Sequence, residues 1–374
     1  MLSELSYKIK EAFSFEGINK PIFVCSVLVL VLGMFSFFSA SMGFLNKVEN
    51  EQFFTNFIQT QMIAYAIGIF AILTAYFLNV KIFARLSIYL YVFSIFLCML
   101  IFIPGLELVH GGGSRWINLF GFSLQPADIL KFSSIIIFST YFSKYKKYLL
   151  TIRYGVLYPV LMLIPVVLVF FLQRDLGSLS IIFFIVAAMY LLNKTRLSYL
   201  IIAVLGGIII IGLYAFMNSY VMDRIKGMQN ESYQTKQSLI ALGSGNILGR
   251  GYGQSVQKFS YLPEPAGDSI YAVVGEEFGF VGTVFVAVLF FVIILTSILI
   301  ANKTSNTFNR NIIYGIALLF FAQFVMNTGS MTKIIPLSGD TLPFFSKGGT
   351  AIIMNMFELG VLLKLTRRDI IKEQ

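Results

Sequence analysis

The sequence predicts an all-α polytopic membrane protein, and three observations support this prediction. Apolar residues occupy 57% of the 374 positions and charged residues only 12%, about half of the roughly 25% found in soluble domains. The mean hydropathy is +0.82. A helix needs about 20 apolar residues to cross a bilayer core about 30 Å thick, and apolar runs of that length recur along the chain. This composition excludes a soluble enzyme, a DNA-binding domain and a disordered scaffold.

The apolar runs predict about ten transmembrane helices within a single integral-membrane domain, residues 1–374. The first run is longer than the roughly 7–15 apolar residues of a signal peptide, so it is expected to remain as a helix. One long loop, at about 218–268, separates the seventh and eighth helices and is expected to fold back on the membrane surface. The ten runs lie near 21–44, 60–80, 86–105, 127–143, 153–172, 176–193, 198–217, 269–301, 311–332 and 344–364.

Charged residues predict the orientation of these helices. With both termini in the cytoplasm, the cytoplasmic segments hold 17 basic and 5 acidic residues, and the outer segments hold 10 and 9. An excess of Lys and Arg marks cytoplasmic loops, so we expect cytoplasmic termini and an outer 218–268 loop. The net charge of +10 includes no dense Lys/Arg block, so nucleic-acid binding is not expected.

The cysteine and histidine content predicts neither a disulfide framework nor a zinc site. Cys25 and Cys98 both lie within apolar runs, where a free thiol behaves as a small hydrophobe. His110 is the only histidine, and the sequence has no Cys/His cluster. We therefore assign no metal-ligating residues.

Two charged residues fall inside the fourth predicted helix, where charge is costly and marks a candidate functional site. Asp128 and Lys131 are three positions apart, so they share a helix face and can form an ion pair. One interpretation is a structural ion pair that locks two helices together. The other is a cation held in a cavity to meet an anionic substrate.

Asp268 opens the eighth predicted helix, and two interpretations apply to it. Position alone favours a helix N-cap. Alternatively, partial burial at the membrane boundary keeps its pKa high enough to accept a proton. Deeper in the helix, one of the two residues Glu276 and Glu277 is expected to pair internally. Helical spacing places small residues on the Asp268 face, where another helix could approach closely: Ala272, Gly275, Gly279 and Gly282.

Three further segments stand out by composition. Residues 111–116 form a glycine-rich outer loop with Arg115 and the only Trp, which suggests either a weak phosphate loop or an interfacial anchor. Residues 173–177 form a tight outer turn with an internal charge pair, Arg174 and Asp175. Residues 342–349 place Pro, Lys and two glycines at the mouth of the last span, which predicts either a helix kink or an irregular segment lining a cavity.

Five separated motifs are spread over nearly the whole chain: Gly113–Ile117, Leu124–Asp128 with Lys131, Gln173–Gly177, Gln237-Ser238 with Gly243–Gly245 and Gly249, and Leu262–Asp268 with Gly275–Gly279. They resemble the motifs of the SEDS family (shape, elongation, division and sporulation), which includes FtsW and RodA. Three departures from the family pattern are Ala266-Gly267 in place of His-Thr, Lys347 in place of Tyr, and Asp128 in place of Glu. Gly275-Glu276-Glu277 and Thr341–Phe344 favour the FtsW branch.

The resemblance implies a peptidoglycan glycosyltransferase of the bacterial cytoplasmic membrane. Such enzymes polymerise lipid II, a disaccharide-pentapeptide on undecaprenyl pyrophosphate, with inversion at the anomeric carbon, during division or elongation. Asp268 is the implied general base. The partners implied are a class B penicillin-binding transpeptidase and other division or elongation proteins. The resemblance leaves open whether a divalent cation (Mg²⁺ or Mn²⁺) serves as a cofactor. Candidate substrate-binding residues are Lys131, Asp128, Arg115, Glu264, Gln237, Ser346 and Lys347.

Two other functions remain compatible with the sequence. A flippase or transporter of lipid-linked precursors would depend on Asp128, Lys131 and Glu358 within the spans more than on Asp268. A non-catalytic division scaffold would still function without the Asp268 carboxylate.

Overall fold

The computed structural model describes residues 17–44, 51–110, 113–119, 122–193, 195–196, 198–199, 201, 206–207, 232–336 and 339–367. Most of the predicted span 198–217, and residues 218–231 of the long loop, lie outside the described residues.

Long apolar helices dominate the described part of the chain, and most of their ends lie within about five residues of the predicted spans. The main exception is the helix that begins at Glu51, before the predicted span 60–80. Six helical segments are long and apolar enough to cross a membrane. The prediction of an all-α polytopic membrane protein is thereby confirmed. The main helices are α2 (Lys20–Ser41), α3 (Glu51–Phe77), α4 (Lys81–Met99), α5 (Pro126–Lys144), α6 (Tyr158–Gln173), α7 (Leu176–Leu192), α12 (Ile270–Lys303), α13 (Thr307–Met331) and α14 (Gly349–Leu365).

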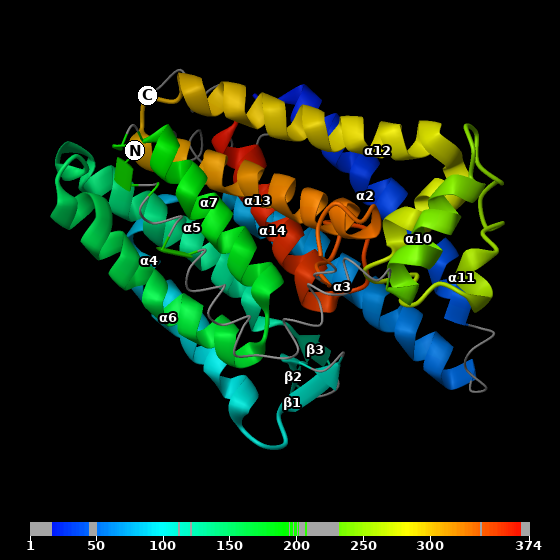
Figure 1. The fold of residues 1–374 in the computed structure, drawn as a ribbon. Helices are drawn as coiled ribbons and strands as arrows, with labels where there is room; N and C mark the ends of the chain where they lie inside the picture. The colour runs from blue at the N-terminus through cyan, green and yellow to red at the C-terminus, as the bar shows by residue number, and fades with distance from the viewer. Residues whose placement is uncertain are drawn as a thin grey trace, which may run out of the picture.

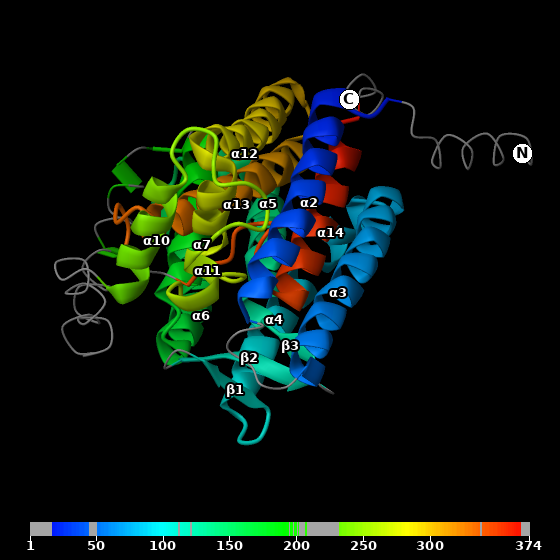
Figure 2. The same cartoon turned by 90° about the vertical axis from the view of Figure 1, so that its right-hand side faces the viewer.

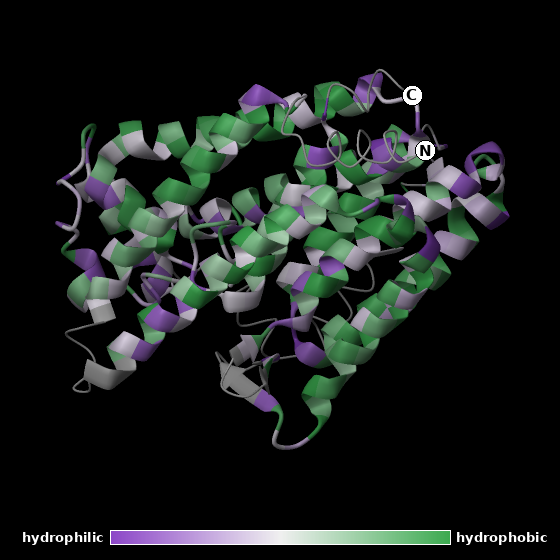
Figure 3. Cartoon of the chain, turned by 180° about the vertical axis from the view of Figure 1, so that it is seen from behind, coloured by the Kyte–Doolittle hydropathy of each residue, from purple (hydrophilic) through white to green (hydrophobic). Residues whose placement is uncertain are grey.

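The helices pack as a bundle with a buried centre and an apolar exterior. α5, α13 and α14 lie inside, and α14 packs against both α2 and α3, as Figure 2 shows. Large apolar side chains such as Phe70 and Ile88 stay exposed on the outer helices. Hydrophobic residues cover most of the helices in Figure 3, and hydrophilic ones gather mainly near helix ends and in connections. This is the distribution expected of helices that face lipid.

A small antiparallel sheet follows α4 and precedes α5 in the chain, and it lies at the lower end of the molecule in Figure 1. Its strands are β1 (Glu107–His110), β2 (Gly113–Leu119) and β3 (Phe122–Leu124). The prediction of a glycine-rich loop at 111–116 is wrong for its described residues, because Trp116 and Ile117 pair with Leu108 and Glu107. Side chains two apart on a strand point to the same face. Arg115 and Ile117 are therefore buried together.

Helix α12 is broken at Gly279, which has φ 68° and ψ −166°, a conformation that essentially only glycine adopts. The predicted continuous small-residue face through Gly279 and Gly282 is therefore wrong. Backbone groups freed by the break pair with residues 246–251 instead. Phe280 and Val281 N–H donate to Asn246 and Ile247, and Arg250 and Gly251 N–H donate to Glu276 and Glu277 carbonyls, at 2.9–3.1 Å.

The described part of the long predicted loop contains two short helices, α10 (Tyr233–Ser244) and α11 (Gln257–Ser260). α10 packs along α12, and Leu242 touches Gly275, where a β-carbon would lie only 2.4 Å from the leucine side chain. The loop therefore folds back onto the helix bundle and brings residues 261–269 over its end.

Candidate active site

Asp268 lies at the end of the 261–269 loop and is half-buried. It lies beside a second segment, called here the 332–348 loop, of which residues 332–336 and 339–348 are described. A β-carbon on Gly339 would lie 3.4 Å from Asp268 Oδ2 and 3.5 Å from Arg115 Nη1. The carboxylate and the guanidinium therefore border the same small space at Gly339. Asp268 is half-buried beside this space, and Arg115 is buried.

The helix N-cap interpretation of Asp268 is wrong. Ser269 occupies the N-cap position of α12 and makes no side-chain capping bond there. Its hydroxyl instead accepts a hydrogen bond from Gln234 Nε2 at 3.1 Å.

The backbone around Asp268 is held by three hydrogen bonds from other segments. Asn327, fully buried on α13, donates from Nδ2 to the Asp268 carbonyl at 3.0 Å and to the Asp340 carbonyl at 2.8 Å. Ser346 Oγ donates to the Gly267 carbonyl at 2.8 Å, and Lys347 N–H to the Ala266 carbonyl at 2.6 Å. The sequence predictions did not include Asn327, although an amide side chain inside an apolar run was a usable signal.

Arg115 links the sheet to the turn between α6 and α7. Its Nη2 donates to the Arg174 carbonyl at 2.9 Å, and its Nη1 lies 3.8 Å from Asp175 Oδ1. The predicted charge pair within the turn is wrong, because Arg174 adopts a left-handed conformation (φ 56°) and Asp175 turns inward. Asp175 Oδ1 also accepts from Ser178 N–H at 3.2 Å, which caps α7.

The charges around Asp175 outweigh the effect of its burial. Burial alone would raise the pKa of this carboxyl, but Arg115, then Lys131, and the Ser178 hydrogen bonds lower it below the ordinary 3.8. Asp175 therefore stays ionised and holds Arg115 in place toward Gly339.

Arg115→Met is expected to destabilise the folded protein by about 3–5 kcal/mol at neutral pH, because it leaves the Asp175 carboxylate buried without its closest cation. The difference in stability between the variant and the wild type should shrink as the pH falls to about 4. In the variant, buried Asp175 becomes protonated on the way to that pH, and a neutral carboxyl group no longer carries the cost of an unpaired buried charge. Thermal unfolding of both proteins in detergent, measured over that pH range, tests the prediction. A difference independent of pH would contradict it.

The predicted pairing of Asp128 with Lys131 is confirmed. Lys131 Nζ lies 3.1 Å from Asp128 Oδ1 on α5, and both side chains are almost fully buried. The charge of Lys131 also acts on Asp175 and Asp340. Lys131 and Arg115 therefore both act on the Asp175 carboxylate and belong to one group of buried charges.

Asp340 belongs to this group through the 332–348 loop. A β-carbon on Gly177, in the first turn of α7, would lie 2.3 Å from Asp340 Oδ2, so the Asp340 carboxylate lies directly against the α7 backbone at Gly177. Within the described ranges, no three His, Cys, Asp or Glu side chains gather in a way that could hold a metal ion.

The remaining predicted site residues lie around the 261–269 loop. The Glu264 carbonyl accepts from Gly267 and Ser269 N–H, closing the turn before Asp268. Lys347 places its ammonium 4.3 Å from the Phe57 ring centroid and interacts electrostatically with Glu264. Gln237 is half-buried on α10, one turn after Gln234. The structure thus groups Asp268, Arg115 and Lys131, and places Lys347 against α3.

An apolar pocket lies elsewhere, between the first part of α6 and the last part of α7. Its lining includes Gly155, Pro159, Phe183 and Tyr190. Because Arg115 meets the opposite ends of these two helices, at Arg174 and Asp175, this pocket is separate from the Asp268 site.

Residues 19–370 match the family model of FtsW, RodA and SpoVE, described as a cell cycle protein family. The chain belongs to this family. The resemblance inferred from the five motifs is therefore confirmed. Two relatives in the FtsW/RodA/SpoVE family are Stage V sporulation protein E of Bacillus subtilis, 30% identical with 92% of this chain and 95% of the relative covered, and a probable peptidoglycan glycosyltransferase FtsW of Coxiella burnetii, 31% identical with 92% and 95% covered.

Solved structures share the fold of this family member. A peptidoglycan synthase complex described for the coordination of polymerization and crosslinking contains a chain with a TM-score of 0.76 at 20% identity. RodA of Thermus thermophilus, a rod shape determining protein, gives 0.68 at 21% identity. Each comparison covers 94% of this chain and 98% of the other.

Proposed function

We propose that this chain is a peptidoglycan glycosyltransferase that polymerises lipid II into glycan strands. The observation that carries the proposal is the half-buried Asp268 carboxylate facing Arg115 across Gly339. Its support from the comparisons is membership of a family with relatives that are named peptidoglycan glycosyltransferases.

The proposed reaction is a single displacement at the anomeric carbon of the donor MurNAc. Asp268 takes the proton from the 4-hydroxyl of the acceptor GlcNAc as that oxygen forms its bond to the anomeric carbon. The bond from this carbon to the lipid diphosphate breaks, and the diphosphate leaves with the electron pair, so the configuration inverts. Arg115 and Lys131 stabilise the negative charge that develops on the departing diphosphate.

The proposed topology places this site at the outer leaflet of the bacterial cytoplasmic membrane. Ten spans in one domain, residues 1–374, put both termini and the basic helix ends in the cytoplasm. Examples are Lys81 at the start of α4, Lys144 at the end of α5, and Lys303 at the end of α12. The sheet, the α6–α7 turn, and the 261–269 and 332–348 loops then share the outer side. Lipid II carries its sugars there.

The proposed partners follow from the same family. A class B penicillin-binding transpeptidase would crosslink the strands, together with other division or elongation proteins, and the motifs favour the FtsW branch. A divalent cation is compatible with the proposal if most of its ligands come from the diphosphate and from water, as is often the case for Mg²⁺. No step above depends on it.

The departures from the family pattern do not remove the contacts that hold Asp268. Ala266 and Gly267 receive their hydrogen bonds at backbone carbonyls, and Lys347 donates through its backbone N–H. Side-chain identity at these three positions is therefore compatible with the same loop geometry.

Polymerisation of purified lipid II by the full-length protein tests the proposal, with and without the partner transpeptidase. Glycan strands resolved by gel electrophoresis would support it. A parallel assay should follow lipid II scrambling in vesicles. Scrambling without any glycan product would instead support the flippase alternative.

Gly339→Ala is expected to lower the polymerisation rate by about tenfold or more. The added methyl group would lie in ordinary contact with Asp268 and Arg115 and occupy the space that they border, so the reacting groups of the substrate could no longer be placed there. The left-handed backbone at Gly339 (φ 74°) adds a strain of about 1 kcal/mol. Gly105→Ala is the matched control, since Gly105 also has a positive φ but open space around it. Equal rates in the two variants would contradict the prediction.

A further inference from the structure

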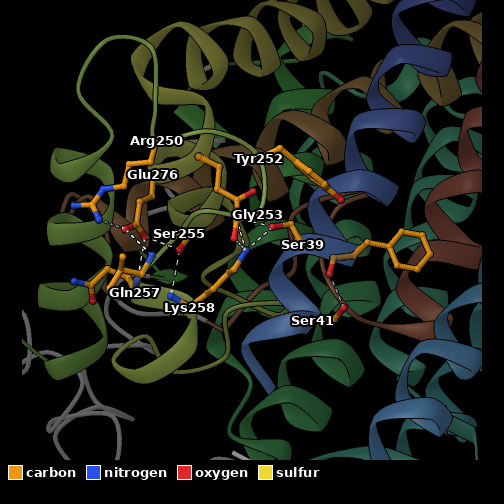
Figure 4. Close-up of polar contacts among 12 residues, drawn as sticks. Ser39, Ser41, Arg250, Tyr252, Gly253, Ser255, Gln257, Lys258 and Glu276 are labelled. Atoms are coloured by element: carbon orange, nitrogen blue, oxygen red, sulfur yellow. Dashed lines mark hydrogen bonds and ion pairs between the residues drawn. The ribbon is translucent and has the colours of Figure 1, made fainter. Parts of the chain in front are cut away.

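One buried ion pair closes the segment of chain that carries Asp268. Lys258 Nζ lies 2.6 Å from Glu277 Oε1, and the two side chains are 0% and 1% exposed. The covalent segment between them, 258–277, contains Asp268 near its middle. The pair therefore joins the two ends of the Asp268 loop directly. Figure 4 shows the Lys258 side chain beside Ser39 and Gly253.

The Lys258 ammonium has a complete set of acceptors. Besides Glu277, it donates to Ser39 Oγ at 2.7 Å and to the Gly253 carbonyl at 3.0 Å, which satisfies its three donors. Ser39 Oγ in turn donates to Glu277 Oε1 at 2.5 Å. Because Ser39 lies on α2, this triad of Lys258, Glu277 and Ser39 ties the Asp268 loop to the helix bundle.

Glu276 holds the preceding part of the loop in the same way. Its carboxylate accepts from Ser255 Oγ at 2.5 Å and from Val256 and Gln257 N–H at 3.0 and 3.2 Å. Arg250 lies 3.5 Å away on the exposed side. The predicted internal pairing of one of Glu276 and Glu277 is found for both: each anchors the loop, about one turn before the break at Gly279.

A buried ion pair contributes little net stability compared with apolar residues of the same volume, but it strongly disfavours any arrangement that separates its charges. A shift of α11 along α12 would leave Lys258 or Glu277 buried without a partner. The 261–269 loop contains no long regular element of its own. Its placement therefore depends on how its two ends are held.

We propose that the triad of Lys258, Glu277 and Ser39 is a positioning device that sets the place of the Asp268 carboxylate relative to Arg115. The proposal rests on the proposed glycosyltransferase function and adds residues that act through Asp268 without touching the substrate.

The test compares full-length variants in the lipid II polymerisation assay. Lys258→Met and Glu277→Gln are expected to lower kcat by about 100-fold, with KM within about threefold, because a misplacement near 1 Å has effects of this size. Ser39→Ala keeps both charges and is expected to lower kcat by about fivefold. It carries the test if the charge variants fail to fold.

An Asp268→Glu background separates positioning from general damage. The longer side chain of Asp268→Glu already moves the carboxylate away from its wild-type position, so its placement no longer depends on the triad. In this background, Lys258→Met and Ser39→Ala should lower the residual rate by no more than about twofold. Equal fold losses in both backgrounds would overturn the proposal.

Tyr252→Phe is the matched control. Tyr252 lies just before the Asp268 loop and also connects to α2, because its hydroxyl donates to the Phe35 carbonyl at 3.0 Å, but it is not part of the triad. Its rate should match the wild type. Wild-type kcat in Lys258→Met or Ser39→Ala would overturn the positioning role. Absence of glycan from the wild-type protein would instead refute the proposed function.

Discussion

Asp268→Ala and Asp268→Asn are expected to reduce lipid II polymerisation by about 10²–10⁴-fold, the usual contribution of a general base. Neither change should affect folding. The side chain is half-exposed, and Asn327 and Gln234 hold the backbone carbonyl of Asp268 and the hydroxyl of Ser269, which both variants retain. Single-turnover glycan formation, with thermal unfolding alongside, measures both quantities.

Glu107→Gln provides the matched control for the loss of one carboxylate. Glu107 is exposed on β1, in the segment that also carries Arg115, and its variant should polymerise at the wild-type rate. Near-normal polymerisation by Asp268→Asn would show that another group accepts the proton.

Lys131→Met is expected to lower the rate by about 10²–10³-fold, because a buried cation aimed at developing negative charge makes a contribution of that size. The single variant should also lose about 3–5 kcal/mol of stability, since Asp128 remains buried with its partner removed. The effect of the lost cation on the polymerisation rate must therefore be measured in a variant that does not also lose this stability.

The double variant Asp128→Asn/Lys131→Met separates the two interpretations of the pair. It removes both charges of the Asp128–Lys131 pair, so its unfolding temperature should recover most of the loss caused by Lys131→Met. Polymerisation should stay low, because the cation is still missing. Recovery of both stability and activity would instead assign the pair a structural role alone.

Local sequence predicted the helices well, because the thickness of a bilayer sets the length of an apolar run. The run at 21–44 became α2 at Lys20–Ser41, and the run at 311–332 became α13 at Thr307–Met331. Helical spacing also placed Asp128 and Lys131 on one face, where they pair. These features depend only on neighbours within a few turns.

The small sheet and the break in α12 could not be predicted in this way. Trp116 pairs with Leu108 in the neighbouring strand, and the glycines between them in the sequence suggested a loop. Gly279 lies in a run of small and apolar residues, where a glycine that permits helix packing has the same local pattern as a glycine that breaks the helix. The difference depends on residues 246–251, which pair with the freed backbone groups.

The sequence by itself determined the membrane-spanning character of the chain, its family, and the residue types available for chemistry. Only the tertiary structure decided which of them meet: Arg115 from a strand, Asp175 from a helical turn, and Asp268 from a loop. It also decided that both Glu276 and Glu277 anchor the loop. The physical reason is that short-range patterns set burial and helix length, whereas partners for buried charges are chosen among segments far apart in the chain.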